Sequence, residues 1–187
     1  DMLASGRSTF YDGPAGERRC FDVGTKKPAP LPRDPHRIRL SALHETKTNI
    51  VQKNASASLV DLGDGCLCLE VQTKLNTIDS DVIAMMGSAV EEAERNFEAL
   101  VIANDGEHFG AGANLMLIFM AAQQKEWGQL ESIVRGFQGA CQGLRNATVP
   151  VVAAPCRYTF GGAAEIAMSA DACQAHAETY MGLVEVG

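Results

Sequence analysis

Two glutamates have apolar neighbours on both sides, Glu165 in "FGGAAEIAMSAD" and Glu185 in "MGLVEVG". Apolar surroundings disfavour the charged carboxylate and raise its pKa toward neutral pH, where it can donate or accept a proton. The pair therefore suggests general acid and base chemistry. For Glu165 alone an alternative stays open, because capping and the helix dipole also favour a glutamate in the first turn of a helix.

Two glycine loops each lie between a predicted strand and a predicted helix. The first is Gly110-Ala111-Gly112-Ala113-Asn114, and the second is the pair Gly161-Gly162. Small residues allow close approach of backbone N–H groups, and two such groups at helix N-termini are what an oxyanion hole requires. For either loop taken alone, simple close packing is the alternative.

Several other site classes are disfavoured by the sequence. Leu115 occupies the place of the third glycine of a dinucleotide-binding loop, and no Gly-Lys-Ser/Thr of a P-loop or G-x-S-x-G elbow of a serine hydrolase is present. The six cysteines lack metal-ligand spacing, so we expect no metal site and interpret them as reduced thiols of a cytoplasmic protein. A disulfide between Cys66 and Cys68 is the less favoured alternative.

The elements that position these loops alternate between strand and helix. Hydrophobic spacing and turn residues predict a hairpin over 57–72, strands over 98–105, 147–156 and 178–186, and helices over 79–96, 115–124, 127–144 and 162–170. Strand followed by helix in this order indicates an α/β fold with a mainly parallel sheet.

Length and composition fit one globular domain with an appendage. The chain has 187 residues, of which 46% are hydrophobic, and a net charge of −7 that gives nucleic acid no basic surface to bind. No apolar run approaches the ~20 residues of a membrane span, and no signal peptide is evident. Residues 1–49 are expected to form an N-terminal extension or interdomain linker, with an extended connector or disordered tail around the proline-rich 26–35, and residues 50–187 the catalytic domain.

The order of three segments, "EHFGAGANL", "VPVVAAPCRYTFGGAAEIAMSAD" and "AETYMGLVEVG", resembles the crotonase superfamily over residues 51–187, and within it the enoyl-CoA hydratases. It is closer still to the hydratase domain of bacterial multifunctional 3-hydroxyacyl-CoA dehydrogenases of fatty-acid oxidation. The resemblance implies a crotonase-like (ClpP/crotonase) ββα spiral. It also implies that the residues given stop before the family's C-terminal helices, which complete the acyl pocket and the trimer contacts.

The resemblance assigns roles to the residues of both loops and to both glutamates. The N–H groups of Ala113 and Gly162 would hold the thioester oxygen of a 2-enoyl-CoA as an oxyanion. Glu165 would activate water for addition at C3 and Glu185 would deliver a proton to C2, although which glutamate is acid and which is base stays open because neighbouring carboxyls titrate together.

Further contacts with the substrate follow from the same resemblance. Lys74 and Leu75 in "TKLNTI" match a loop that contacts CoA, and Ala111, Gly112 and Gly161 accompany the two donors. An ordinary solvated charge is the alternative for Lys74. The only cofactor implied is CoA itself, carried as part of the acyl-CoA thioester substrate.

Two other functions remain open from the sequence. Family members that isomerise double bonds can work with one carboxylate at the position of Glu185, so the presence of both glutamates favours a hydratase over an enoyl-CoA isomerase. A non-catalytic, CoA-thioester-binding fragment of a multifunctional dehydrogenase is the other alternative. The family implies a homo-oligomer or a part of a multidomain β-oxidation enzyme.

Overall fold

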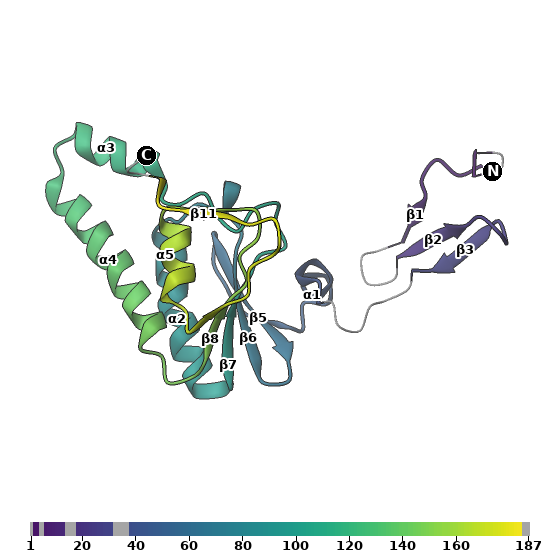
Figure 1. Cartoon of the computed structure of the whole chain (residues 1–187), viewed down its shortest axis with the longest axis horizontal. Coiled ribbons are helices and arrows are strands. Elements are labelled where there is room, and N and C mark those ends of the chain that lie inside the picture. Colours follow the sequence, from purple (N-terminus) through teal and green to yellow (C-terminus); the bar gives the residue numbers. More distant parts are fainter. Residues whose placement is uncertain (1, 4–5, 14–17, 32–37, 185–187) are drawn as a thin grey trace. The chain divides into compact units, whose positions relative to one another are not determined.

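The structure is a computed structural model and describes residues 2–3, 6–13, 18–31 and 38–184. The chain divides into two compact units, Asp1–Thr48 and Asn49–Gly187 (Figure 1). The site residues predicted from the sequence all belong to the second unit.

The first unit contains a small antiparallel sheet and a short helix. The sheet has the order β1-β2-β3, formed by Tyr11–Asp12, Arg19–Asp22 and Lys27–Pro30, and α1 spans Leu40–Thr46. The proline-rich stretch 26–35, expected to be an extended connector or a disordered tail, therefore contains the strand β3. Its prolines, Pro28 and Pro30, pair with β2 from the edge of the sheet, where a missing N–H interrupts no second ladder.

A six-stranded sheet forms the centre of the second unit, in the order β10-β8-β7-β6-β5-β4. Its strands are β4 (Ile50–Lys53), β5 (Ala57–Gly63), β6 (Cys66–Val71), β7 (Ala99–Ile102), β8 (Val151–Ala153) and β10 (Ala172–Cys173). Strands β6, β7, β8 and β10 run parallel, whereas β4, β5 and β6 are antiparallel neighbours. The predicted α/β class with a mainly parallel sheet and the predicted hairpin are confirmed.

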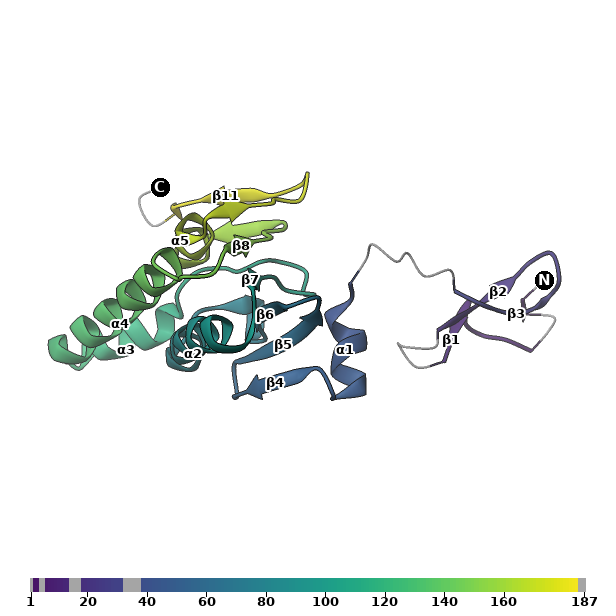
Figure 2. The same ribbon diagram turned by 90° about the horizontal axis from the view of Figure 1, so that it is seen from below.

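Four helices accompany this sheet, close to the ranges predicted from hydrophobic spacing. They are α2 (Ser80–Asn96), α3 (Leu115–Gln123), α4 (Trp127–Arg145) and α5 (Gly162–Ser169). Helix α2 packs on β5, β6 and β7, and α4 lies alongside α2 and α5 with α3 near its N-terminal end (Figures 1 and 2). No helix in the described ranges is long and apolar enough to cross a membrane.

Helix α2 supplies much of the core beneath the site. Its buried face consists of Val82, Met85, Met86, Ala89 and Ala93. These side chains belong to one hydrophobic cluster with fully buried leucines of β6 and β7, and each large side chain contributes roughly 1.5–3 kcal/mol on burial. Asp79 begins the helix by accepting a hydrogen bond from the Val82 amide at 2.9 Å.

A separate two-stranded sheet leads into α5. It pairs β9 (Tyr158–Phe160) in parallel with β11 (Tyr180–Gly182). The sequence predicted a strand that contains β11 but assigned no strand to residues 157–160. The Gly161 amide donates to the Gly182 carbonyl at 2.9 Å, so this pairing fixes the turn from which α5 starts.

Candidate active site

The two glycine loops lie against each other although they are distant in sequence. The amide of Gly110 donates to the Tyr158 carbonyl, and the amide of Phe160 donates to the Gly110 carbonyl, both at 3.0 Å. The first loop therefore runs beside β9 as a short parallel pairing. This pairing carries Gly112 and Ala113 to the start of α5.

Glycine is required in the first loop because the two chains approach so closely. A Cβ on Gly110 would lie 2.8 Å from the Ala163 Cβ and 3.0 Å from the Asn76 carbonyl oxygen. Gly112 has a φ of +89°, and a Cβ there would lie 3.5 Å from the Gly162 nitrogen. For each loop taken alone, close packing was the alternative explanation of its glycines. The structure shows that the glycines do allow the two backbones to pack closely at this point.

Two backbone amides at this junction are uncommitted. Within the described ranges, no carbonyl accepts a hydrogen bond from the N–H of Ala113 or of Gly162. Gly162 is the first residue of α5, so its N–H has no intrahelical acceptor and lies at the positive end of the helix dipole. The prediction that these two N–H groups hold one oxygen together stays a prediction.

Backbone and amide contacts hold the Ala113 donor in place. Ile78 brackets it, because its N–H donates to the Gly112 carbonyl at 2.9 Å and its carbonyl accepts from the Asn114 amide at 3.1 Å. Asn104 Nδ2 donates to the Phe109 carbonyl at 2.6 Å, and its Oδ1 accepts from the Val71 amide at 2.7 Å. Neither Ile78 nor Asn104 was predicted as a site residue from the sequence, although an asparagine at the end of a buried strand is a usable signal.

Glu165 lies one helical turn beyond Gly162, as predicted, but its side chain is exposed. The small residues of α5 face the core, whereas Glu165 and Met168 occupy the opposite face. The expectation of a desolvated carboxylate is therefore wrong for this structure. Burial raises the pKa of the Cys141 thiol on α4, and the negative charge of the Glu165 carboxylate adds to the rise.

The remaining predicted residues divide into two groups. Lys74 and Leu75 lie in a 3-10 turn (Lys74–Asn76) beside the first loop, where the Ala111 amide donates to the Leu75 carbonyl at 3.1 Å. Lys74, Leu75 and Ala111 are exposed, so they are accessible to a ligand. Glu185 lies outside the described residues.

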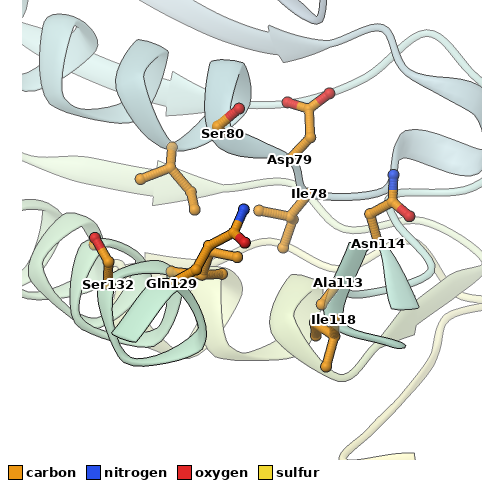
Figure 3. A pocket seen from close by; sticks show the side chains of 11 residues that line it. Ile78, Asp79, Ser80, Ala113, Asn114, Ile118, Gln129 and Ser132 are labelled. Carbon is orange, nitrogen blue, oxygen red and sulfur yellow. The ribbon is translucent and has the colours of Figure 1, made fainter. Parts of the chain in front are cut away.

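A cavity of about 360 Å³ adjoins Ala113. Four isoleucines line it, namely Ile78, Ile83, Ile118 and Ile133. Figure 3 shows Ala113 and Ile118 on one side, Gln129 and Ser132 of α4 on another, and Ser80 and Asp79 at the start of α2. Among the residues that line this cavity, only Ala113 was predicted as a site residue from the sequence. In the described part of the chain, no group of three or more His, Cys, Asp or Glu could hold a metal ion.

Comparison with solved structures identifies the fold. An enoyl-CoA hydratase from Thermoplasma volcanium GSS1 matches with a TM-score of 0.63 and 23% identity, over 71% of this chain and 53% of that one. An enoyl-CoA hydratase from Shewanella pealeana ATCC 700345 gives a TM-score of 0.64 and 23% identity, over 70% and 50%. The chain has the crotonase fold, which confirms the predicted fold class.

Sequence comparison connects the chain to a longer protein. It is 41% identical over 187 residues to "Probable 3-hydroxyacyl-CoA dehydrogenase" of Bacillus subtilis (strain 168), a match covering 100% of this chain and 23% of that protein. The chain thus spans about a quarter of the curated relative and about half of the solved structures. The resemblance to the multifunctional dehydrogenases is confirmed, and no protein-family model matches the chain.

Proposed function

We propose that this protein is an enoyl-CoA hydratase that adds water across the double bond of a 2-enoyl-CoA. The observation that carries the proposal is the pair of uncommitted amides, Ala113 and Gly162, brought together by the contact of their loops. A thioester carbonyl gains negative charge as water adds to the conjugated double bond, and fixed N–H donors stabilise that charge without reorganising. Each such donor typically contributes on the order of 100- to 1,000-fold in rate.

The chemistry is completed by the two glutamates. Glu165 accepts a proton from water while the water oxygen bonds to C3, and the electron pair of the double bond moves toward the thioester oxygen held by Ala113 and Gly162. Glu185 then delivers a proton to C2, which restores the carbonyl and gives a 3-hydroxyacyl-CoA. The exposed position of Glu165 beside Gly162 leaves its carboxylate open to both water and substrate.

The Bacillus subtilis relative supports a reaction sequence in which hydration precedes a dehydrogenation step. A 3-hydroxyacyl-CoA dehydrogenase, as that protein's description reads, consumes the product that hydration of a 2-enoyl-CoA supplies. A hydratase within a longer polypeptide of this kind would feed the dehydrogenase directly. We propose no cofactor beyond the CoA of the substrate, since backbone donors provide the polarisation of the carbonyl.

An enoyl-CoA isomerase is the second candidate, because the same pair of amides stabilises the dienolate of a 3-enoyl-CoA. The two activities are separated by supplying each substrate to the purified protein. Loss of the conjugated absorbance of a 2-enoyl-CoA, with 3-hydroxyacyl-CoA identified by mass spectrometry, supports the hydratase. Gain of conjugated absorbance from a 3-enoyl-CoA without hydration supports the isomerase, and binding without either reaction contradicts both.

A further inference from the structure

We propose that Asn76 is a positioning residue that joins the exposed turn Lys74–Asn76 to the first glycine loop, so that contact of this turn with the CoA part of the substrate aligns the Ala113 N–H. This inference rests on the proposed function, because it takes Ala113 as a donor to the thioester oxygen. It assigns a role to a residue that acts through the loop and not on the reacting atoms.

The side chain of Asn76 reaches from the turn to the segment that leads into the first loop. Its Nδ2 donates to the His108 carbonyl at 2.7 Å. A Cβ on Gly106 would lie 3.1 Å from this Nδ2, and a Cβ on Gly110 would lie 3.0 Å from the Asn76 carbonyl oxygen. Asn76 is therefore packed against this segment on both sides of the carbonyl to which it donates.

Backbone contacts continue the link from the turn to the proposed donor. The Ala111 amide donates to the Leu75 carbonyl at 3.1 Å. Two residues after Asn76, Ile78 forms a parallel bridge with Ala113. A displacement of the turn is therefore transmitted to Ala113 over a short stretch of backbone.

The backbone of the turn needs this support. Leu75 and Asn76 have φ angles of +56° and +51°, in the left-handed region that asparagine adopts more readily than most residues with a side chain. Such strain persists only where the surrounding structure holds it, and it is common at ligand-binding segments. The hydrogen bond from Asn76 to His108 is one of the contacts that hold it here.

A second asparagine anchors the adjacent carbonyl to the core instead. Asn104 donates to the Phe109 carbonyl at 2.6 Å and accepts from the Val71 amide of β6 at 2.7 Å. The segment is thus fixed to the sheet through one carbonyl and to the turn through the one before it. Of these two links, the one through Asn76 leads to an exposed turn that a ligand can contact.

The turn presents a positive charge and an apolar side chain to such a ligand. Lys74 is exposed and pairs with no carboxylate in the described part of the chain, and Leu75 is 55% exposed. CoA extends from the thioester sulfur as an amide chain that ends in phosphates, so it offers a group to each side chain. Binding energy from remote groups raises kcat when it is used to orient the reacting centre.

The test compares crotonyl-CoA with crotonyl-N-acetylcysteamine, which carries the same acyl thioester but lacks the phosphates of CoA. Asn76→Gly removes the side-chain donor and keeps a residue that adopts the left-handed region readily. It should lower kcat for crotonyl-CoA by about 10- to 100-fold and leave KM within about threefold. Its kcat/KM for crotonyl-N-acetylcysteamine should stay within about threefold of that of the unaltered protein, because this substrate does not engage the turn.

Two controls separate positioning from stability. Asn104→Ala breaks the anchor to the sheet and should lower kcat/KM for both substrates by the same factor. Asn146→Gly removes another hydrogen bond from an asparagine Nδ2 to a carbonyl, that of Gln142 at 2.9 Å at the end of α4, and should change neither. Equal losses for both substrates in Asn76→Gly, or no loss for either, would overturn the inference. If Asn76→Gly does not fold, Asn76→Asp, which keeps the size of asparagine but has no N–H to donate at neutral pH, should give the same difference between the substrates.

Hydrogen exchange distinguishes failure of this inference from failure of the proposed function. CoA without an acyl group should slow amide exchange in residues 108–114 of the unaltered protein, whereas in Asn76→Gly it should bind without slowing this exchange. If neither substrate is hydrated and this difference is observed, the proposed function is contradicted and the link through Asn76 stands. Absence of CoA binding, or equal protection of the loop in both proteins, overturns the inference.

Discussion

Gly110 and Ala163 touch across the junction of the two loops so closely that a Cβ on Gly110 would lie 2.8 Å from the Ala163 Cβ. Gly110→Ala forces the first loop away from α5 and should destabilise the protein by about 1–3 kcal/mol, the usual cost of overpacking. Thermal unfolding would show a melting temperature lower by ~2–4 °C per kcal/mol. Gly139→Ala, at an open helical position, serves as control, and equal melting temperatures for the two variants would contradict this close contact.

A substitution at Gly112 tests the alignment of the proposed N–H donors separately from the stability of the protein. Its φ of +89° disfavours any side chain, and a Cβ would lie 3.1 Å from the Phe160 carbonyl oxygen. Gly112→Ala should shift the adjacent Ala113 amide and lower kcat/KM by on the order of 100-fold, as small misplacements of catalytic groups do. Circular dichroism checks that the fold is retained, and a folded variant with unchanged kcat/KM would show that the alignment of this loop is unimportant.

Asp79 ties α2 to the neighbouring hairpin. Its carboxylate accepts from the Val82 amide at 2.9 Å and from the Ser56 hydroxyl at 2.6 Å. Asp79→Ala removes both bonds and should lower the free energy of unfolding by about 1–2 kcal/mol, measured with urea. Asp81→Ala, which removes an exposed carboxylate from the same first turn, should cost no more than about 1 kcal/mol, and a larger loss there would contradict the assigned cap.

Cys68 is fully buried on β6, and burial raises the pKa of its thiol to about 12, with Glu70 adding to the rise. The folded state holds this proton more tightly than the unfolded state, so the stabilisation is complete below pH 9 and is lost as pH rises from about 9 to about 12. Cys68→Ala should therefore flatten the decline in stability over this window.

Alkylation of the folded protein checks the same burial. At pH 8, iodoacetamide should modify the exposed Cys173 and leave Cys68 unmodified, as resolved by peptide mass spectrometry. Rapid modification of Cys68 without unfolding would contradict its burial.

Local signals in the sequence were sufficient to predict most helices and strands of the second unit. The period of the apolar residues located α2, and the Gly63-Asp64-Gly65 turn located the hairpin of β5 and β6. The strand β9 was missed because three residues give no usable period, and its pairing with β11 depends on contacts distant in sequence. Likewise, the apolar neighbours of Glu165 suggested burial, but helix geometry directs those neighbours inward and the carboxylate outward.

The cavity could not be predicted for the same reason. Its isoleucines come from the approach to α2, from α2, from α3 and from α4, and each fits an ordinary core position when considered alone. By contrast, the two glycine loops could be located from the sequence, because glycines at two strand-to-helix turns of one chain indicate places where backbone amides can be approached closely. Their role as hydrogen-bond donors to a substrate stays a prediction.

The most direct test of the central claim is the rate of crotonyl-CoA hydration by the Glu165→Gln variant, compared with Glu178→Gln. Both substitutions replace an exposed carboxylate by its neutral isostere, but only Glu165 lies in the first turn of α5, which begins at Gly162. If Glu165 activates water, Glu165→Gln lowers kcat by about 100- to 10,000-fold, whereas Glu178→Gln stays within about twofold. Equal rates for the two variants and the unaltered protein would show that Glu165 takes no part in the chemistry.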